Sequence, residues 1–92
     1  MALSPDTVLS VLPGLSVADL GGEAVVLDPV EGEYFGLNEV AARILALIGD
    51  GMTLSQVVDH LLTEYEVDRA RLEADVRVFV ADLDRRGLVT AR

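Results

Sequence analysis

The sequence predicts an α+β fold in which a small antiparallel sheet precedes three helices. In residues 7–37, short apolar runs alternate with Gly and Pro pairs, a pattern typical of strands joined by tight turns. From Asn38 onward the apolar spacing changes to about 3.6 residues, the period of an amphipathic helix. Because strands and helices are segregated along the chain, we expect the helices to cover one face of the sheet.

The first third of the chain supplies two or three strands. Residues 7–12 are predicted as a short strand, and residues 15–20 are only weakly strand-like. Residues 23–28 and 33–37 are predicted as the two strands of a hairpin. The connection 29–32 has Pro and Gly at the positions where turns favour them.

Three helices are predicted, each from a residue that can cap a helix N-terminus and an apolar stripe behind it. The capping residues are Asn38, Thr53 and Asp68. The predicted helices end near Gly49, Tyr65 and Arg86. The third helix carries further apolar residues beside its stripe, at Ala74, Val78 and Ala81. This surplus indicates either incomplete burial or a groove beside the sheet.

Composition predicts a single domain over residues 1–92 that folds without cross-links. The chain has 92 residues, 51% of them hydrophobic, and no Cys, which excludes disulfides and thiolate chemistry. Residues 1–6 lack the basic and apolar regions of a signal peptide, and no apolar run is long enough to span a bilayer. We expect a cytoplasmic protein with no membrane partner.

The charge is unevenly distributed. The net charge is −9, and residues 1–42 contain seven acidic residues but no Lys or Arg. All seven Arg lie from Arg43 onward. This pattern indicates either an ordinary acidic protein or a negative field that attracts a basic partner. Under both interpretations phosphate backbones are repelled.

No constellation of residues predicts catalysis. His60 is the sole histidine, and a metal site would need several ligands. The neighbouring acids Asp82 and Asp84 point to different sides of the predicted helix, and no glycine-rich phosphate loop follows a strand. The sequence therefore predicts a protein that is not an enzyme and holds neither metal nor cofactor.

A DNA-binding alternative deserves weight because the second and third helices resemble a helix-turn-helix and the hairpin could form a wing. The third helix carries five arginines, at Arg69, Arg71, Arg77, Arg85 and Arg86. It also carries or adjoins five acids, at Asp68, Glu73, Asp75, Asp82 and Asp84. These acids cancel the cationic stripe, which disfavours a nucleic-acid partner.

An ordered series of short motifs resembles the PqqD-like family of peptide recognition elements. The series begins with Val26-Leu27-Asp28 and Gly32-x-Tyr34-Phe35-x-Leu37-Asn38. It continues with Asp50-Gly51-x-Thr53, Val57-Val58-x-x-Leu61 and Tyr65, and ends with Asp68, Asp75-Val76, Phe79, Leu83 and Gly87-Leu88. The resemblance covers about residues 7–89 of the chain.

The resemblance implies a winged helix-turn-helix-like fold whose partner is the leader region of a ribosomally made precursor peptide. The leader would add as a β-strand beside the third strand and pack on the third helix. The chain looks most like stand-alone lasso-peptide recognition proteins, which work with a leader-cleaving cysteine protease and an ATP-dependent macrocyclase. A pyrroloquinoline quinone peptide chaperone is the alternative within the family, and a winged-helix DNA-binding regulator is the alternative outside it.

The family pattern also implies which residues form the peptide site. Residues 33–37 would pair with the leader through backbone groups, with Phe35 and Leu37 on one face and Tyr34 on the other. The implied peptide-binding residues are Val26, Leu27, Asp28, Glu33, Tyr34, Phe35, Gly36, Leu37, Leu72, Asp75, Val76 and Phe79. For Leu37, Leu72 and Val76, packing in the core is the competing explanation of why an apolar residue stands there.

Overall fold

The computed structural model describes residues 3–92, so Met1 and Ala2 of the predicted domain lie outside the described residues. The elements in chain order are β1 (Leu9–Val11), β2 (Ser16–Leu20), β3 (Glu23–Leu27), β4 (Tyr34–Leu37), α1 (Glu39–Gly49), α2 (Leu54–Glu64), α3 (Arg69–Arg85) and β5 (Val89–Ala91). The predicted α+β fold, with a three-stranded antiparallel sheet and three helices, is confirmed.

The strands form two separate sheets. The three-stranded sheet has the order β2-β3-β4, so β2 and β4 are its edges. β1 pairs with β5 in a two-stranded ribbon, with Ser10 opposite Thr90. The strand predicted over residues 7–12 therefore lies outside the main sheet, and the weakly predicted segment 15–20 supplies the missing strand. The partner of β1 was not predicted, because a pairing between the two chain ends leaves no local pattern.

The predicted helix caps are present. The Asn38 side chain accepts a hydrogen bond from the Ala41 N–H at 2.8 Å, and Asp68 caps α3 in the same way. Thr53 and Gln56 form a complete capping box at α2, with distances of 3.1 and 2.9 Å. These bonds satisfy helix N–H groups that have no partner within the helix.

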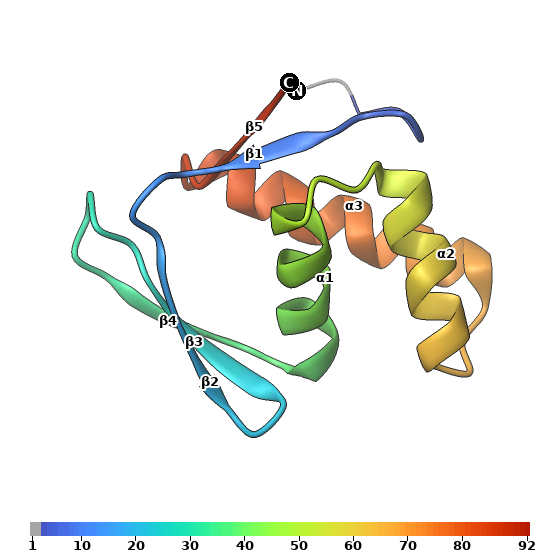
Figure 1. Cartoon of the computed structure of the whole chain (residues 1–92), viewed down its shortest axis with the longest axis horizontal. Helices are drawn as coiled ribbons and strands as arrows, with labels where there is room; N and C mark the ends of the chain where they lie inside the picture. Colours follow the sequence, from blue (N-terminus) through green and yellow to red (C-terminus); the bar gives the residue numbers. More distant parts are fainter. Residues whose placement is uncertain (1–2) are drawn as a thin grey trace.

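The core lies around α1, which stands between the three-stranded sheet and the other two helices (Figure 1). The buried residues of the core come from every element except β2. The largest fully buried side chains include Leu9, Ile44, Leu47, Ile48, Leu61, Leu83 and Leu88. All five residues of β2 are exposed, so this strand contributes backbone pairing rather than core volume.

The β3–β4 hairpin is closed by Asp28 and Gly32. The Asp28 carboxylate accepts hydrogen bonds from the N–H groups of Val30 and Glu31, at 2.9 and 3.3 Å. The Gly32 N–H donates to the Asp28 carbonyl and the Asp28 N–H donates to the Glu33 carbonyl, both at 2.8 Å. This pattern, with Gly32 at a φ of +70°, is a β-bulge that only glycine adopts without strain. Asp28 and Glu33 therefore form a hydrogen-bonded pair, and this pair determines which residues of β4 bond to β3 and which point away from it.

Candidate functional site

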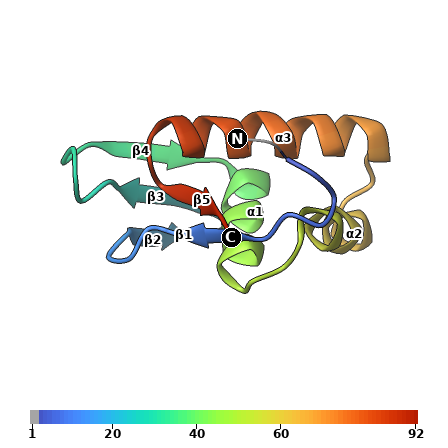
Figure 2. The same ribbon diagram turned by 90° about the horizontal axis from the view of Figure 1, so that it is seen from above.

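The outer edge of β4 is free to accept another strand. Hydrogen-bonded positions alternate along an antiparallel pair, and the pair of Asp28 with Glu33 fixes that alternation. Phe35 and Leu37 therefore bond to β3, and the backbone N–H and C=O groups of Tyr34 and Gly36 point away from the sheet. Figure 2 shows that β4 is the edge of the sheet on the side of α3.

The inner face of β4 is tied to the helices through aromatic and aliphatic contacts. Leu37 is buried and Phe35 is partly buried against the core, whereas Tyr34 is exposed on the opposite face. The Arg86 guanidinium lies over the Phe35 ring, 4.7 Å from its centroid, a distance that allows a cation–π attraction. This contact joins the start of β4 to the C-terminal end of α3.

A groove of about 490 Å³ begins at Asn38, directly after β4, and lies between α1, α3 and the connection that joins α2 to α3. Its lining is mostly apolar and consists of Asn38, Val40, Ala41, Ile44, Tyr65, Val67, Arg71, Leu72, Asp75, Val78 and Phe79. Val78 is 71% exposed and Val67 is 46% exposed, so both are large apolar side chains without cover. We call this cavity, together with the free edge of β4, the β4–α3 groove.

Contacts at two points show how β4 and α3 are oriented relative to each other. Phe35 meets Arg86 just beyond the end of α3, whereas Asn38, three residues further along the chain, lines the groove together with Phe79. β4 and α3 therefore run in opposite directions along the groove. The charged pair Arg71 and Asp75, 3.9 Å apart, lies on its α3 wall. An extended peptide could bond to the backbone of β4 while its side chains contact α3.

The structure brings together some of the predicted site residues and separates others. Tyr34, Gly36 and Phe35 lie along β4, and Leu72, Asp75 and Phe79 lie on the α3 wall of the groove. Leu37 lies in the same strand, but its side chain is buried in the core. Glu33 pairs with Asp28 at the start of this strand. Leu27 lies on the central strand opposite Tyr34.

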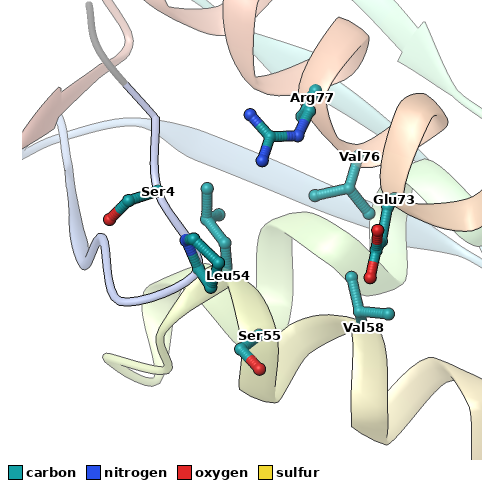
Figure 3. Close-up of a pocket in the computed structure, with 8 residues that line it drawn as sticks. Ser4, Leu54, Ser55, Val58, Glu73, Val76 and Arg77 are labelled. Carbon is teal, nitrogen blue, oxygen red and sulfur yellow. The ribbon is translucent and has the colours of Figure 1, made fainter. Parts of the chain in front are cut away.

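Three further predicted residues, besides Leu37 and Leu27, do not reach the groove surface. Val26 is fully buried in the central strand, and Asp28 is buried while its carboxylate holds the hairpin turn. Val76 is 1% exposed and lines a different cavity of about 160 Å³ between α2 and α3 (Figure 3). The reason is the turn of the helix, because Val76 is rotated by about 100° from Asp75 and points toward Val58 of α2.

Sequence reasoning missed several residues that line the groove or fasten its end. Val40, Ala41, Val67 and Arg86 were not among the predicted peptide-binding residues, although the first three line the groove and Arg86 contacts Phe35. The surplus apolar surface of the third helix did contain a signal, because Val78 is one of its members and lies in the groove. The position of Val67 between two helices, with no apolar periodicity of its own, was the other available signal.

The arginines of α3 are occupied by partners within the chain. Arg69 bonds to Asp59 and Glu73, and both Arg85 and Arg86 bond to Asp82. Arg71 lies beside Asp75, and Arg77 donates to the Leu3 carbonyl at 3.3 Å. These contacts neutralise the helix that would enter a DNA groove, so they weigh against the DNA-binding alternative.

The remaining titratable residues form surface contacts. His60 lies on α2 with its Nδ1 3.7 Å from Glu64, whose pKa is lowered by hydrogen bonds from Arg43. Over residues 3–92, no three His, Cys, Asp or Glu side chains converge as metal ligands would. Within the same range, no helix combines the length and apolar character needed to cross a bilayer.

Comparison with known families identifies related proteins. Residues 23–89 match the family described as Coenzyme PQQ synthesis protein D (PqqD). A curated relative, the PqqA binding protein of Rhodopseudomonas palustris (strain BisB5), is 34% identical over 53 residues, or 58% of this chain and 52% of that protein. The chain therefore spans about half the length of the curated relative it matches.

Solved structures of similar proteins agree with this match. TbiB1 in complex with the TbiA(beta) leader peptide has a TM-score of 0.79 and 34% identity, covering 86% of this chain and 92% of that chain. Lasso peptide synthetase B1 complexed with the leader peptide has a TM-score of 0.79 and 35% identity, covering 89% and 96%. The PqqD truncation of Methylobacterium extorquens PqqCD, a stand-alone RiPP recognition element, has a TM-score of 0.79 and 28% identity, covering 97% and 95%.

Proposed function

The chain belongs to the PqqD family, and from that premise we propose that it recognises the leader region of a ribosomally made precursor peptide. The observation that carries the proposal is the free edge of β4, whose N–H and C=O groups at Tyr34 and Gly36 point outward on the side of α3 (Figure 2). An uncovered apolar groove begins at Asn38, directly after this strand. A leader would add as a fourth strand and place alternate side chains in the groove. Two similar proteins with solved structures are complexed with leader peptides, which supports this assignment.

We further propose that the chain delivers the leader to lasso-peptide maturation enzymes and has no catalytic activity of its own. Those enzymes would be a leader-cleaving cysteine protease and an ATP-dependent macrocyclase, acting in the cytoplasm. Support comes from the identity of 35% to lasso peptide synthetase B1 over nearly its whole length. The alternative is a peptide chaperone of quinone biosynthesis, which the identity to the PqqA binding protein favours.

Strand addition can be tested by removing one backbone donor from the free edge. In Gly36→Pro the pyrrolidine ring replaces the outward N–H, while the bonds to β3 at Phe35 and Leu37 remain. Gly36→Ala is the matched control, because its N–H is kept and an added Cβ meets no atom within 4 Å. We expect Gly36→Pro to weaken leader binding by at least about fivefold, the equivalent of one net hydrogen bond, and Gly36→Ala to bind like the parent.

The measurement is fluorescence anisotropy with labelled TbiA(beta) leader peptide, labelled PqqA and a labelled DNA duplex. Tighter binding of the TbiA(beta) leader supports the lasso-peptide assignment, and tighter binding of PqqA supports the quinone alternative. Binding of the duplex alone, or of none of the three, overturns peptide recognition. Equal affinity of the Gly36→Pro and Gly36→Ala variants would overturn strand addition at β4.

A further inference from the structure

The three-stranded sheet has a second free edge, at β2, on the side away from α3 (Figure 2). The alternation that turns Tyr34 and Gly36 outward on β4 also fixes β2, because Val25 and Leu27 of the central strand must then bond to Ala18 and Ser16. The backbone N–H and C=O groups of Val17 and Asp19 consequently point away from the sheet. The side chains of these two residues lie on the face toward the helices, opposite Val26 and Ala24.

A groove runs beneath this edge, between β2 and α1. It consists of two adjoining cavities of about 330 and 410 Å³, which share Val17, Ala42 and Ala46 in their linings. The first lies toward the C-terminal end of α1, and every residue that lines it is apolar or Gly, including Leu15, Leu45 and Gly49. Val17 is 50% exposed above it. We call both cavities and the free edge the β2–α1 groove.

The second cavity, toward the N-terminal end of α1, is acidic. Its lining includes four carboxylates, at Asp19, Glu23, Glu39 and Glu64, and a single basic side chain, Arg43. Arg43 forms a bidentate ion pair with Glu64, with two hydrogen bonds of 2.8 Å. The positive charge of Arg43 therefore compensates Glu64 and not the other three carboxylates. The Glu39 carboxylate accepts a hydrogen bond from the Tyr65 hydroxyl at 3.2 Å, which fixes its position but leaves its charge uncompensated. The β2–α1 groove therefore changes from apolar to negative along α1.

This gradient selects the chemistry of the occupant. A second copy of the chain, paired antiparallel, would place its apolar end against the acidic cavity and so supply no basic residue to the four carboxylates. Two chains that each carry a net charge of −9 also repel each other. We propose that the β2–α1 groove binds an extended segment with Arg or Lys at one end and apolar side chains at the other, supplied by an enzyme that acts on the bound leader. The identity of that enzyme rests on the proposed function, whereas the binding surface does not. Because β3 separates the two edges, leader and enzyme segment can be bound at the same time.

The direction of the segment follows from β2, which runs from the apolar cavity at Leu15 to the acidic cavity at Asp19. An antiparallel segment, the more stable pairing, therefore carries its basic residues toward its N-terminus. The probe is the synthetic peptide acetyl-Arg-Thr-Arg-Thr-Val-Thr-Leu-amide, which places Arg, Arg, Val and Leu on one face. A second peptide with Glu in place of both Arg tests the charge, and the reversed sequence tests the direction.

The experiment is a titration of the isotopically labelled full chain followed by amide NMR signals at low salt. We expect the probe to shift the amide signals of Val17 and Asp19 and to leave those of Tyr34 and Gly36 unchanged. The Glu peptide should have no effect, and the reversed peptide should bind more weakly. Val17→Pro removes the outward N–H and should weaken probe binding at least about fivefold, while the control Val17→Thr keeps it.

The same samples are titrated with the TbiA(beta) leader peptide, so that the two hypotheses fail separately. If the chain binds the leader but millimolar probe does not shift the amide signals of Val17 and Asp19, only the present inference is overturned. Probe binding without leader binding overturns the proposed function alone. Equal binding of the Glu peptide, or equal binding by Val17→Pro and Val17→Thr, refutes an acidic strand-pairing site. Concentration-dependent shifts of these amides without probe would assign the edge to a second copy instead.

Discussion

The α3 wall of the β4–α3 groove can be tested by placing the same charge at two neighbouring positions. Val78 lies in the groove and is 71% exposed, whereas Val76 is 1% exposed in the core. Full burial of a valine side chain is worth about 1.5–3 kcal/mol, so covering the 71% exposed Val78 would yield about 1–2 kcal/mol. We therefore expect Val78→Asp to weaken leader binding by about 5- to 30-fold and to leave the melting temperature close to that of the parent.

Val76→Asp should fail differently, because the carboxylate enters the core. The lost burial and the unsatisfied polar group together cost about 3–6 kcal/mol. A domain of 92 residues has a total free energy of unfolding of about 5–14 kcal/mol. This substitution should therefore remove a large part of that free energy and lower the melting temperature strongly. The assay is thermal unfolding beside anisotropy titration of labelled TbiA(beta) leader peptide. Ala81→Asp, exposed on α3 and outside the groove, controls for charge alone. Parent-like affinity of a folded Val78→Asp variant would refute the placement of the anchors in this groove.

Three further outcomes follow from the described contacts. Arg86→Ala should destabilise the fold by about 0.5–1 kcal/mol in urea unfolding through loss of the cation–π contact with Phe35; Arg85→Ala, which loses only its bond to Asp82, should change stability less. The hydrogen bonds from Arg43 lower the pKa of Glu64, so this pair stabilises the protein above the unfolded pKa of about 4.3, and that stability is lost as pH falls through the lower folded pKa. Melting curves between pH 7 and 2 should therefore depend less on pH in Arg43→Gln, and equal dependence in both proteins would contradict the assignment. Stopped-flow association of a basic leader should slow with added salt, because residues 1–42 carry seven acids and no basic residue; an on-rate independent of salt would make the acidic half a solubility feature only.

Helices were predictable from sequence because their signals are local. The caps at Asn38, Thr53 and Asp68 each use atoms within three residues, and all three are present in the structure. The hairpin was predictable for the same reason, since Asp28 and Gly32 complete its turn within six residues. Such signals place the start of α1 directly after β4. The peptide-binding residues themselves were implied by the family resemblance.

The pairing of distant segments was not predictable in the same way. β2 was only weakly indicated because none of its five residues is buried, so no apolar alternation marks it. β5 was not predicted because its partner β1 lies about 80 residues away in the chain. The apolar stripe of α3 showed which residues are buried, but not that Val76 faces α2 while Val78 faces the groove. That distinction depends on how α1 and α2 pack around α3.

The ribbon of β1 and β5 also determines how this domain could be joined to another protein. It brings the C-terminal residues beside β1 at the C-terminal end of α1, where Gly49 shares a cavity with Leu12 and Arg92. Figure 1 shows β5 and β1 side by side above the helices. The β4–α3 groove opens at the opposite end of that helix, at Asn38 and Val40. A covalent fusion through the C-terminus would therefore leave the groove accessible, and a short linker would hold a bound peptide at high effective concentration near the attached catalytic domain. The same domain could thus serve in trans or as a module of a larger enzyme without any change to its binding surface.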